Sequence, residues 1–186
     1  MLDLALQALV RSILAHIPWT HWLAMGLMAL TVPLLLRKKC STYGAIALGL
    51  TVFLGLFLLD AAVINRYLGT LPQSTGFEFT FRRLFHSTES GRAELFANLL
   101  AFVPFGYFLS EFLSTTRRLA PWRRLGLATL LAFALSLSIE CLQLLLHVGH
   151  FELTDLVLNT VGGGVGAGTS VGWRKVVFWK GRGQSL

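Results

Sequence analysis

Four polar side chains interrupt the most apolar part of this 186-residue sequence. Glu140 and Gln143 lie inside one hydrophobic run, and Asp155 and Asn159 lie at the start of the next. The members of each pair are three or four residues apart, so each pair shares one face of a helix. Carboxyl groups in an apolar setting transfer protons, and amides donate and accept hydrogen bonds. These residue types therefore indicate an acid–base site or a site for a polar ligand.

The composition predicts that these side chains lie inside a membrane. Hydrophobic residues make up 54% of the chain, charged residues 13%, and the mean hydropathy is +0.65, which excludes an ordinary soluble domain. We expect an all-α, polytopic transmembrane helix bundle over 21–173, preceded by an amphipathic, interfacial helix over 1–20 and followed by a basic tail over 174–186. The five predicted spanning helices are 21–36, 43–64, 93–113, 124–147 and 153–173.

The placement of positive charge predicts the orientation. The net charge is +7, and the basic residues gather in short connectors at 37–39 and 117–124 and in the tail after Trp173. This pattern is typical of a multi-pass plasma-membrane protein with these segments in the cytoplasm, so we expect a cytoplasmic C-terminus and an outer N-terminus. The expected partner is the lipid bilayer, and nucleic acid is not expected.

This topology brings polar residues from three helices to one depth. At 1.5 Å per residue, Asn98, the Glu140/Gln143 pair and the Asp155/Asn159 pair all lie below the same outer face. We therefore predict a shared polar cavity in the outer leaflet. The alternative is a set of hydrogen bonds that only clamps the helices together.

Small residues and a proline accompany these polar positions. The stretch NTVGGGVGAG, residues 159–168, is typical of close helix packing, with Gly162 and Gly166 below Asn159 and a Gly164/Gly168 pair at GxxxG spacing. A phosphate-binding loop would need a strand–loop–helix setting instead. Pro104 is expected to kink its helix, either to free a carbonyl for the cavity or only for packing.

A metal or cofactor is not expected. Several possible ligands lie near the predicted outer turn, but their spacing matches no specific metal motif. The two cysteines, Cys40 and Cys141, form neither a disulfide framework nor a zinc motif. The possible ligands are Glu140, His147, His150, Glu152 and Asp155.

Three blocks of the sequence resemble the VanZ-like family of small membrane proteins. They are NLLAFVPFG from Asn98, IECLQ around Glu140, and HFELTDLVLNTVGGGVG around Asp155, and the resemblance covers about residues 94–170. It implies an integral membrane protein of the cell envelope, since the founding member is linked to low-level resistance to the antibiotic teicoplanin. The family often has an arginine where this chain has His150, a departure that bears on anion binding.

Two functional hypotheses share the predicted cavity. In the first, the protein acts on a lipid-linked or glycopeptide-related envelope substrate, with Glu140 or Asp155 as the catalytic acid or base. In the second, it is a non-catalytic module that binds lipid or antibiotic. Transport is a weaker alternative, because five helices without inverted repeats suit alternating access poorly. The substrate-binding candidates are Asn98, Gln143, Asn159, His150 and Arg92, and Arg82 and Arg83 join Arg92 as candidates for holding a phosphate head group. The reaction and the oligomeric state stay open.

Overall fold

The computed structural model describes residues 18–36, 41–64, 67, 76–78, 81, 88–116 and 119–182, with 89–91, 93–94 and 175–182 described by backbone only. The predicted interfacial helix over 1–20 therefore lies almost entirely outside the described residues. The elements are α2 (Trp19–Leu36), α3 (Thr42–Leu59), η1 (Asp60–Ile64), β1 (Phe77–Glu78), α6 (Glu89–Thr116), α7 (Pro121–Leu145), β2 (Phe151–Glu152) and α8 (Leu153–Arg182).

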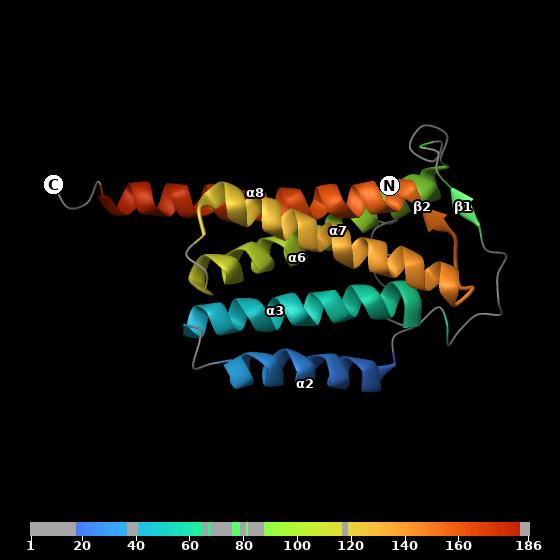
Figure 1. Ribbon diagram of the computed structural model, residues 1–186, viewed down its shortest axis with the longest axis horizontal. Helices are drawn as coiled ribbons and strands as arrows, with labels where there is room; N and C mark the ends of the chain where they lie inside the picture. The colour runs from blue at the N-terminus through green and yellow to red at the C-terminus, as the bar shows by residue number, and fades with distance from the viewer. Residues whose placement is uncertain are drawn as a thin grey trace.

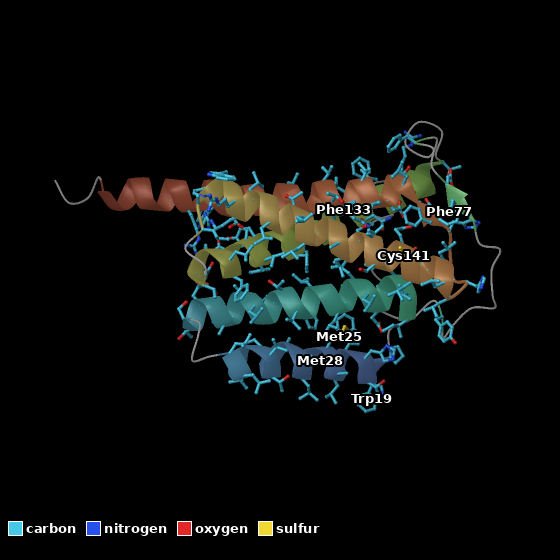
Figure 2. The ribbon with its side chains drawn as sticks, in the orientation of Figure 1. Trp19, Met25, Met28, Phe77, Phe133 and Cys141 are labelled. Atoms are coloured by element: carbon cyan, nitrogen blue, oxygen red, sulfur yellow. The ribbon has the colours of Figure 1, made fainter. Side chains whose placement is uncertain are left out.

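The predicted all-α bundle is confirmed. Within the described residues, four helical segments are long and apolar enough to cross a membrane: Trp19–Leu36, Thr42–Ile64, Leu95–Thr116 and Pro121–Leu145. Leu23, Leu27 and Leu30 on α2 are more than half exposed, which suits contact with lipid tails rather than water. Met25 instead lies buried between α2 and α3 (Figure 2).

The fifth predicted span, 153–173, is the first part of α8. This helix is long, but it does not reach the hydropathy of the other four. Its glycines, together with Asp155 and Asn159, lower the hydropathy. Figure 1 shows α8 lying along α6 and α7, and it packs extensively against both. α8 buries one face against α6 and α7, whereas Val157, Val161 and Val165 on another face are exposed. Its crossing of the membrane stays a prediction.

The α6–α8 contact depends on glycine. A Cβ at Gly162 would overlap the carbonyl of Leu99, and one at Gly166 would overlap the carbonyl of Val103. Gly106 on α6 faces the backbone of Gly163 in the same way. The backbones of the two helices therefore touch, as small residues allow in a membrane bundle.

The predicted Gly164/Gly168 pair makes looser contacts. A Cβ at Gly164 would lie 3.3 Å from Thr129 Oγ1, and one at Gly168 would lie 4.0 Å from a methyl group of Leu125. These two glycines face side chains of α7 rather than backbone. The close packing that the sequence predicted is therefore present, but Gly162 and Gly166 make it.

One end of the bundle is closed by a short parallel strand pair that the all-α prediction did not include. Phe77 of β1 pairs with Phe151 of β2, and the N–H of Phe151 donates to the carbonyl of Gly76 at 3.0 Å. β2 lies in the tight connection between α7 and α8, which confirms that these helices are antiparallel neighbours (Figure 1). The strand pair thus ties the segment before α6 to the start of α8.

Candidate functional site

A cavity of about 200 Å³ lies near the closed end of the bundle. The ends of four elements meet there: α3 with η1, the first half of α6, the last turns of α7 and the first turns of α8. Its walls are mostly apolar, with polar groups at a few positions. The lining residues are Phe57, Leu58, Ala61, Ala62, Ala97, Asn98, Ala101, Phe102, Ile139, Glu140, Gln143, Asp155 and Asn159.

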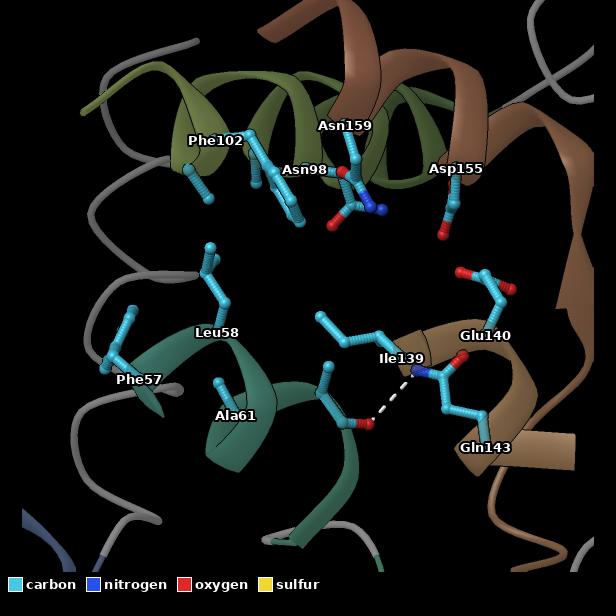
Figure 3. A pocket seen from close by; sticks show the side chains of 13 residues that line it. Phe57, Leu58, Ala61, Asn98, Phe102, Ile139, Glu140, Gln143, Asp155 and Asn159 are labelled. Atoms are coloured by element: carbon cyan, nitrogen blue, oxygen red, sulfur yellow. Dashed lines mark hydrogen bonds between the residues drawn. The ribbon is translucent and has the colours of Figure 1, made fainter. Parts of the chain in front are cut away.

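The structure brings together all five polar residues that the sequence placed at one depth. Asn98 comes from α6, Glu140 and Gln143 from α7, and Asp155 and Asn159 from α8. The helical spacing within each pair turns both side chains toward the same space, as the periodicity predicted. Figure 3 shows the carboxyl groups of Glu140 and Asp155 pointing toward one another across the cavity.

Glu140 is held by the strand pair. It is 3% exposed, and its Oε2 accepts a hydrogen bond from the backbone N–H of Glu152 at 2.7 Å. Glu152 belongs to β2, so the carboxyl group is fixed relative to the closing strands. A buried carboxyl group requires such a partner, because its transfer out of water is costly.

Gln143 connects α7 to η1. Its Nε2 donates a hydrogen bond to the carbonyl of Ala62 at 3.1 Å, across the cavity wall (Figure 3). Ala62 lies in the π-helical turn, which has a hydrogen-bond register different from that of α3. Such turns often occur at functional sites, because they shift side chains and carbonyls out of the α-helical pattern.

Asn159 keeps one acceptor unused. Its Nδ2 donates to Ser136 Oγ at 3.0 Å, and its Oδ1 has no hydrogen-bond partner in the described part of the chain, although the residue is only 5% exposed. A buried amide oxygen without a partner costs about 1–3 kcal/mol. The atom is therefore available to a donor on a ligand or to water in the cavity.

The comparisons with known proteins address the same region. A family profile described as VanZ/LLP1 matches residues 61–174. The chain belongs to the VanZ/LLP1 family. This match confirms the resemblance to the VanZ-like family. It extends beyond the three blocks, because it begins within η1 and ends at Arg174 of α8.

A second comparison agrees with the family profile. Over 75 residues the chain is 32% identical to Protein VanZ of Enterococcus faecium, a match that covers 39% of this chain and 41% of that protein. The matched part is thus less than half the length of that relative. No solved structure matches the chain significantly. Together, the family match and the four apolar helices make this VanZ/LLP1 chain a membrane protein.

Two predicted ligand contacts lie outside the cavity of this VanZ/LLP1 chain. Arg92 is exposed on the first turn of α6, and His150 is exposed in the α7–α8 connection beside Gly76. Neither lines the cavity. Arg82 and Arg83 lie outside the described residues. Of the candidates that the structure describes, the carboxyl and amide residues line the cavity, and Arg92 and His150 do not.

One predicted helix boundary is wrong. The predicted span 124–147 places His147 on the face of Glu140 and Gln143, but α7 ends at Leu145 and His147 has a φ of 56° in the turn. The tight connection to β2 requires this left-handed backbone conformation. Among the described residues, no group of three His, Cys, Asp or Glu side chains forms a metal site.

Sequence reasoning missed Asp60 and its partner. Asp60 is 3% exposed in η1, and its Oδ1 lies 2.6 Å from Nδ1 of His21 on α2. The signal was available, because Asp60 is a lone carboxylate at the end of a long apolar run, like Glu140. This hydrogen bond joins α2 to the π-helical turn beside the cavity.

A second polar network, also missed, lies at the opposite end of the bundle. Glu111 of α6 is 1% exposed and accepts hydrogen bonds from Arg174 Nη2 at 2.6 Å, Ser170 Oγ at 2.7 Å and Tyr43 Oη at 2.8 Å. The hydrogen bonds to Glu111 raise the pKa of the Arg174 guanidinium. The network joins α3, α6 and α8 around one carboxylate, so its immediate role is to hold these helices in register.

Proposed function

We propose that this protein binds one polar, ring-sized group of a cell-envelope component in the cavity between η1, α6, α7 and α8. The observation that carries the proposal is the convergence of two carboxyl and three amide side chains on one cavity of about 200 Å³. A cavity of about 150 Å³ holds a benzene molecule. The volume therefore suits one ring or a short head group rather than a whole glycopeptide or lipid-linked precursor.

The lining favours a particular ligand chemistry. Among the described residues, those that line the cavity include Glu140 and Asp155 but no Lys or Arg. Placing a phosphate beside two carboxyl groups in a low-dielectric space is unfavourable, whereas hydroxyl, amide and ammonium groups pair well with carboxyl and amide oxygens. The unused Oδ1 of Asn159 adds one more acceptor for such a donor. We therefore propose a sugar ring, a peptide amide or an amine as the bound group.

The cell-envelope assignment rests on the family and on the predicted orientation. The VanZ-like family is linked to teicoplanin resistance, and this antibiotic acts outside the membrane. The end of α2, the start of α3 and the start of α7, which flank the basic segments 37–39 and 117–124, lie at the end of the bundle opposite to the cavity (Figure 1). The positive-inside rule therefore favours an outward-facing cavity. A cavity that faces outward is on the side of the membrane where lipid-linked wall precursors and glycopeptides are accessible.

Catalysis is the second candidate function, favoured by the two facing carboxyl groups. An acid and a base from adjacent helices, pointing at one space, are able to move protons on a bound substrate. Glu140 is the better positioned of the two, because the N–H of Glu152 already fixes its carboxyl group.

A cavity-filling variant tests binding. Ala97→Leu adds three carbon atoms to the cavity wall, and Ala134→Leu adds the same atoms at an exposed position on α7 as a matched control. Cells lacking the protein are complemented with each variant, and their envelope lipids, wall precursors and teicoplanin sensitivity are measured. We expect Ala134→Leu to restore the wild-type profile and Ala97→Leu to fail. Full restoration by a stably inserted Ala97→Leu protein would overturn the proposal.

Glu140→Gln separates the two candidate functions. The amide keeps the size and the ability to accept the hydrogen bond from Glu152, but it cannot transfer a proton. A covalently changed envelope product that wild type restores and Glu140→Gln does not would favour catalysis. Full activity of Glu140→Gln would favour binding alone.

A further inference from the structure

The end of the bundle opposite to the cavity carries an uncapped helix N-terminus. α7 begins with Pro121, and the preceding residue, Ala120, provides no side-chain hydrogen bond to the first turn. The free N–H groups of a helix start and its dipole attract anions. α7 has 25 residues, so this effect is fully developed.

Arg124 adds a buried cation to the same turn. It is 5% exposed, and its Nε and Nη1 atoms have no hydrogen-bond partner within the described part of the chain. Side chains on a helix lean toward its N-terminus, so we expect the guanidinium of Arg124 to be directed back toward this turn. A buried guanidinium normally requires a paired acceptor, because burying its charge is costly.

The nearby carboxylate is already engaged. Among the described acidic residues, Glu111 is the one at this end of the bundle, and Arg174, Ser170 and Tyr43 bind it. Arg124 is close enough to interact electrostatically with both Arg174 and Glu111. Two guanidinium groups thus share one carboxylate, which leaves one positive charge without a counter-charge.

Aromatic residues place this turn at the level of lipid head groups. Trp122 and Trp173 are exposed beside it, and Tyr43 is half-exposed at the same end. Tryptophan and tyrosine are enriched where lipid tails meet head groups. Basic pockets between helices at this level bind lipid phosphates.

We propose that the start of α7 binds a phosphate group, with Arg124 as its principal ligand and the first-turn N–H groups as further donors. The phosphate belongs either to the head group of an anionic phospholipid, such as phosphatidylglycerol, or to free inorganic phosphate. This site is separate from the cavity, and its existence does not depend on the proposed function.

The test compares Arg124→Gln with Arg123→Gln. Arg123 is the adjacent residue and is exposed, with its guanidinium 5.0 Å from the ring centroid of Trp122, so both variants lose one charge from the same turn. Native mass spectrometry measures binding of phosphatidylglycerol, phosphatidylcholine and inorganic phosphate to the full chain in detergent. We expect Arg124→Gln to weaken phosphate-group binding by about 10- to 100-fold and Arg123→Gln to leave it within about threefold.

The outcomes distinguish the two sources. Loss of phosphatidylglycerol binding specifically in Arg124→Gln supports the site with a lipid as its ligand, and loss of inorganic phosphate binding supports it with a free anion. Equal binding by the two variants would overturn the proposal. If Arg124→Gln fails to fold, the wild-type protein alone is tested by its unfolding midpoint. We then expect the midpoint to be higher in phosphatidylglycerol than in phosphatidylcholine, or higher in phosphate than in chloride. An equal midpoint in both comparisons would refute the site.

Discussion

Gln143 on α7 donates a hydrogen bond to the backbone carbonyl of Ala62, 81 residues earlier in the chain and inside a π-helical turn. The bond fixes the last turns of α7 against η1, and both form walls of the cavity. A carbonyl displaced from the α-helical pattern needs an outside donor in a membrane, where water is not available to replace it. The π-helical turn and Gln143 are therefore one structural unit.

Gln143→Leu should destabilise this unit. The substitution keeps the side-chain size but leaves the carbonyl of Ala62 without its donor, which costs about 1–3 kcal/mol. Ser138→Ala is the control, because Ser138 is exposed on α7 and its hydroxyl donates a hydrogen bond to the backbone carbonyl of Ala134 in the same helix. Unfolding of the purified protein by denaturant measures both variants. Equal stability of the two would show that the bond to Ala62 contributes little.

Gly166→Ala should loosen the contact between α6 and α8. The new Cβ would overlap the carbonyl of Val103, so the helices must separate, at a cost of about 1–3 kcal/mol. Gly172→Ala is the matched control on the same helix, since no described atom outside its own turn of helix lies within 4 Å of its Cβ position. Thermal unfolding in detergent compares them. A Gly166→Ala protein as stable as Gly172→Ala would contradict the packing described above.

Glu111 and Arg174 should be energetically coupled. Removing Arg174 leaves a buried carboxylate without its cation, whereas removing both charges leaves no such group. A double-mutant cycle with Glu111→Gln and Arg174→Met should give a coupling energy of about 0.5–3 kcal/mol, reduced toward the lower value by the partial exposure of Arg174. Strict additivity of the two single variants would argue against a stabilising pair.

Labelling should place the cavity end outside the cell. Single cysteines at His150 and Ala120, with Cys40 and Cys141 removed, lie beyond opposite ends of α7. An impermeant thiol reagent applied to intact cells should label the cysteine at 150 and spare the one at 120. The reverse pattern would put the cavity on the cytoplasmic side and remove the argument for a cell-wall ligand.

Part of the structure of this protein can be predicted from its sequence alone. The apolar runs are long enough to cross a membrane. Because every backbone N–H and C=O group in the membrane interior needs a hydrogen-bond partner within the protein, these runs form helices. The spacing of Glu140 with Gln143 and of Asp155 with Asn159 determines which side chains share a helix face. Alternating helix directions then bring these two pairs and Asn98 to one depth, which explains why the sequence predicted the cavity residues.

Only the tertiary structure determined the contacts that the depth of a residue in the membrane and the periodicity of a helix do not predict. The Glu111–Arg174 pair joins residues 63 positions apart, and the His21–Asp60 pair joins residues 39 apart. The rotation of α8 made Gly162 and Gly166, rather than Gly164 and Gly168, the backbone contact with α6. Hydropathy determines that a segment is a helix and how deep each residue lies. The rotation of each helix about its axis, and the neighbour it faces, depend on packing all the helices at once.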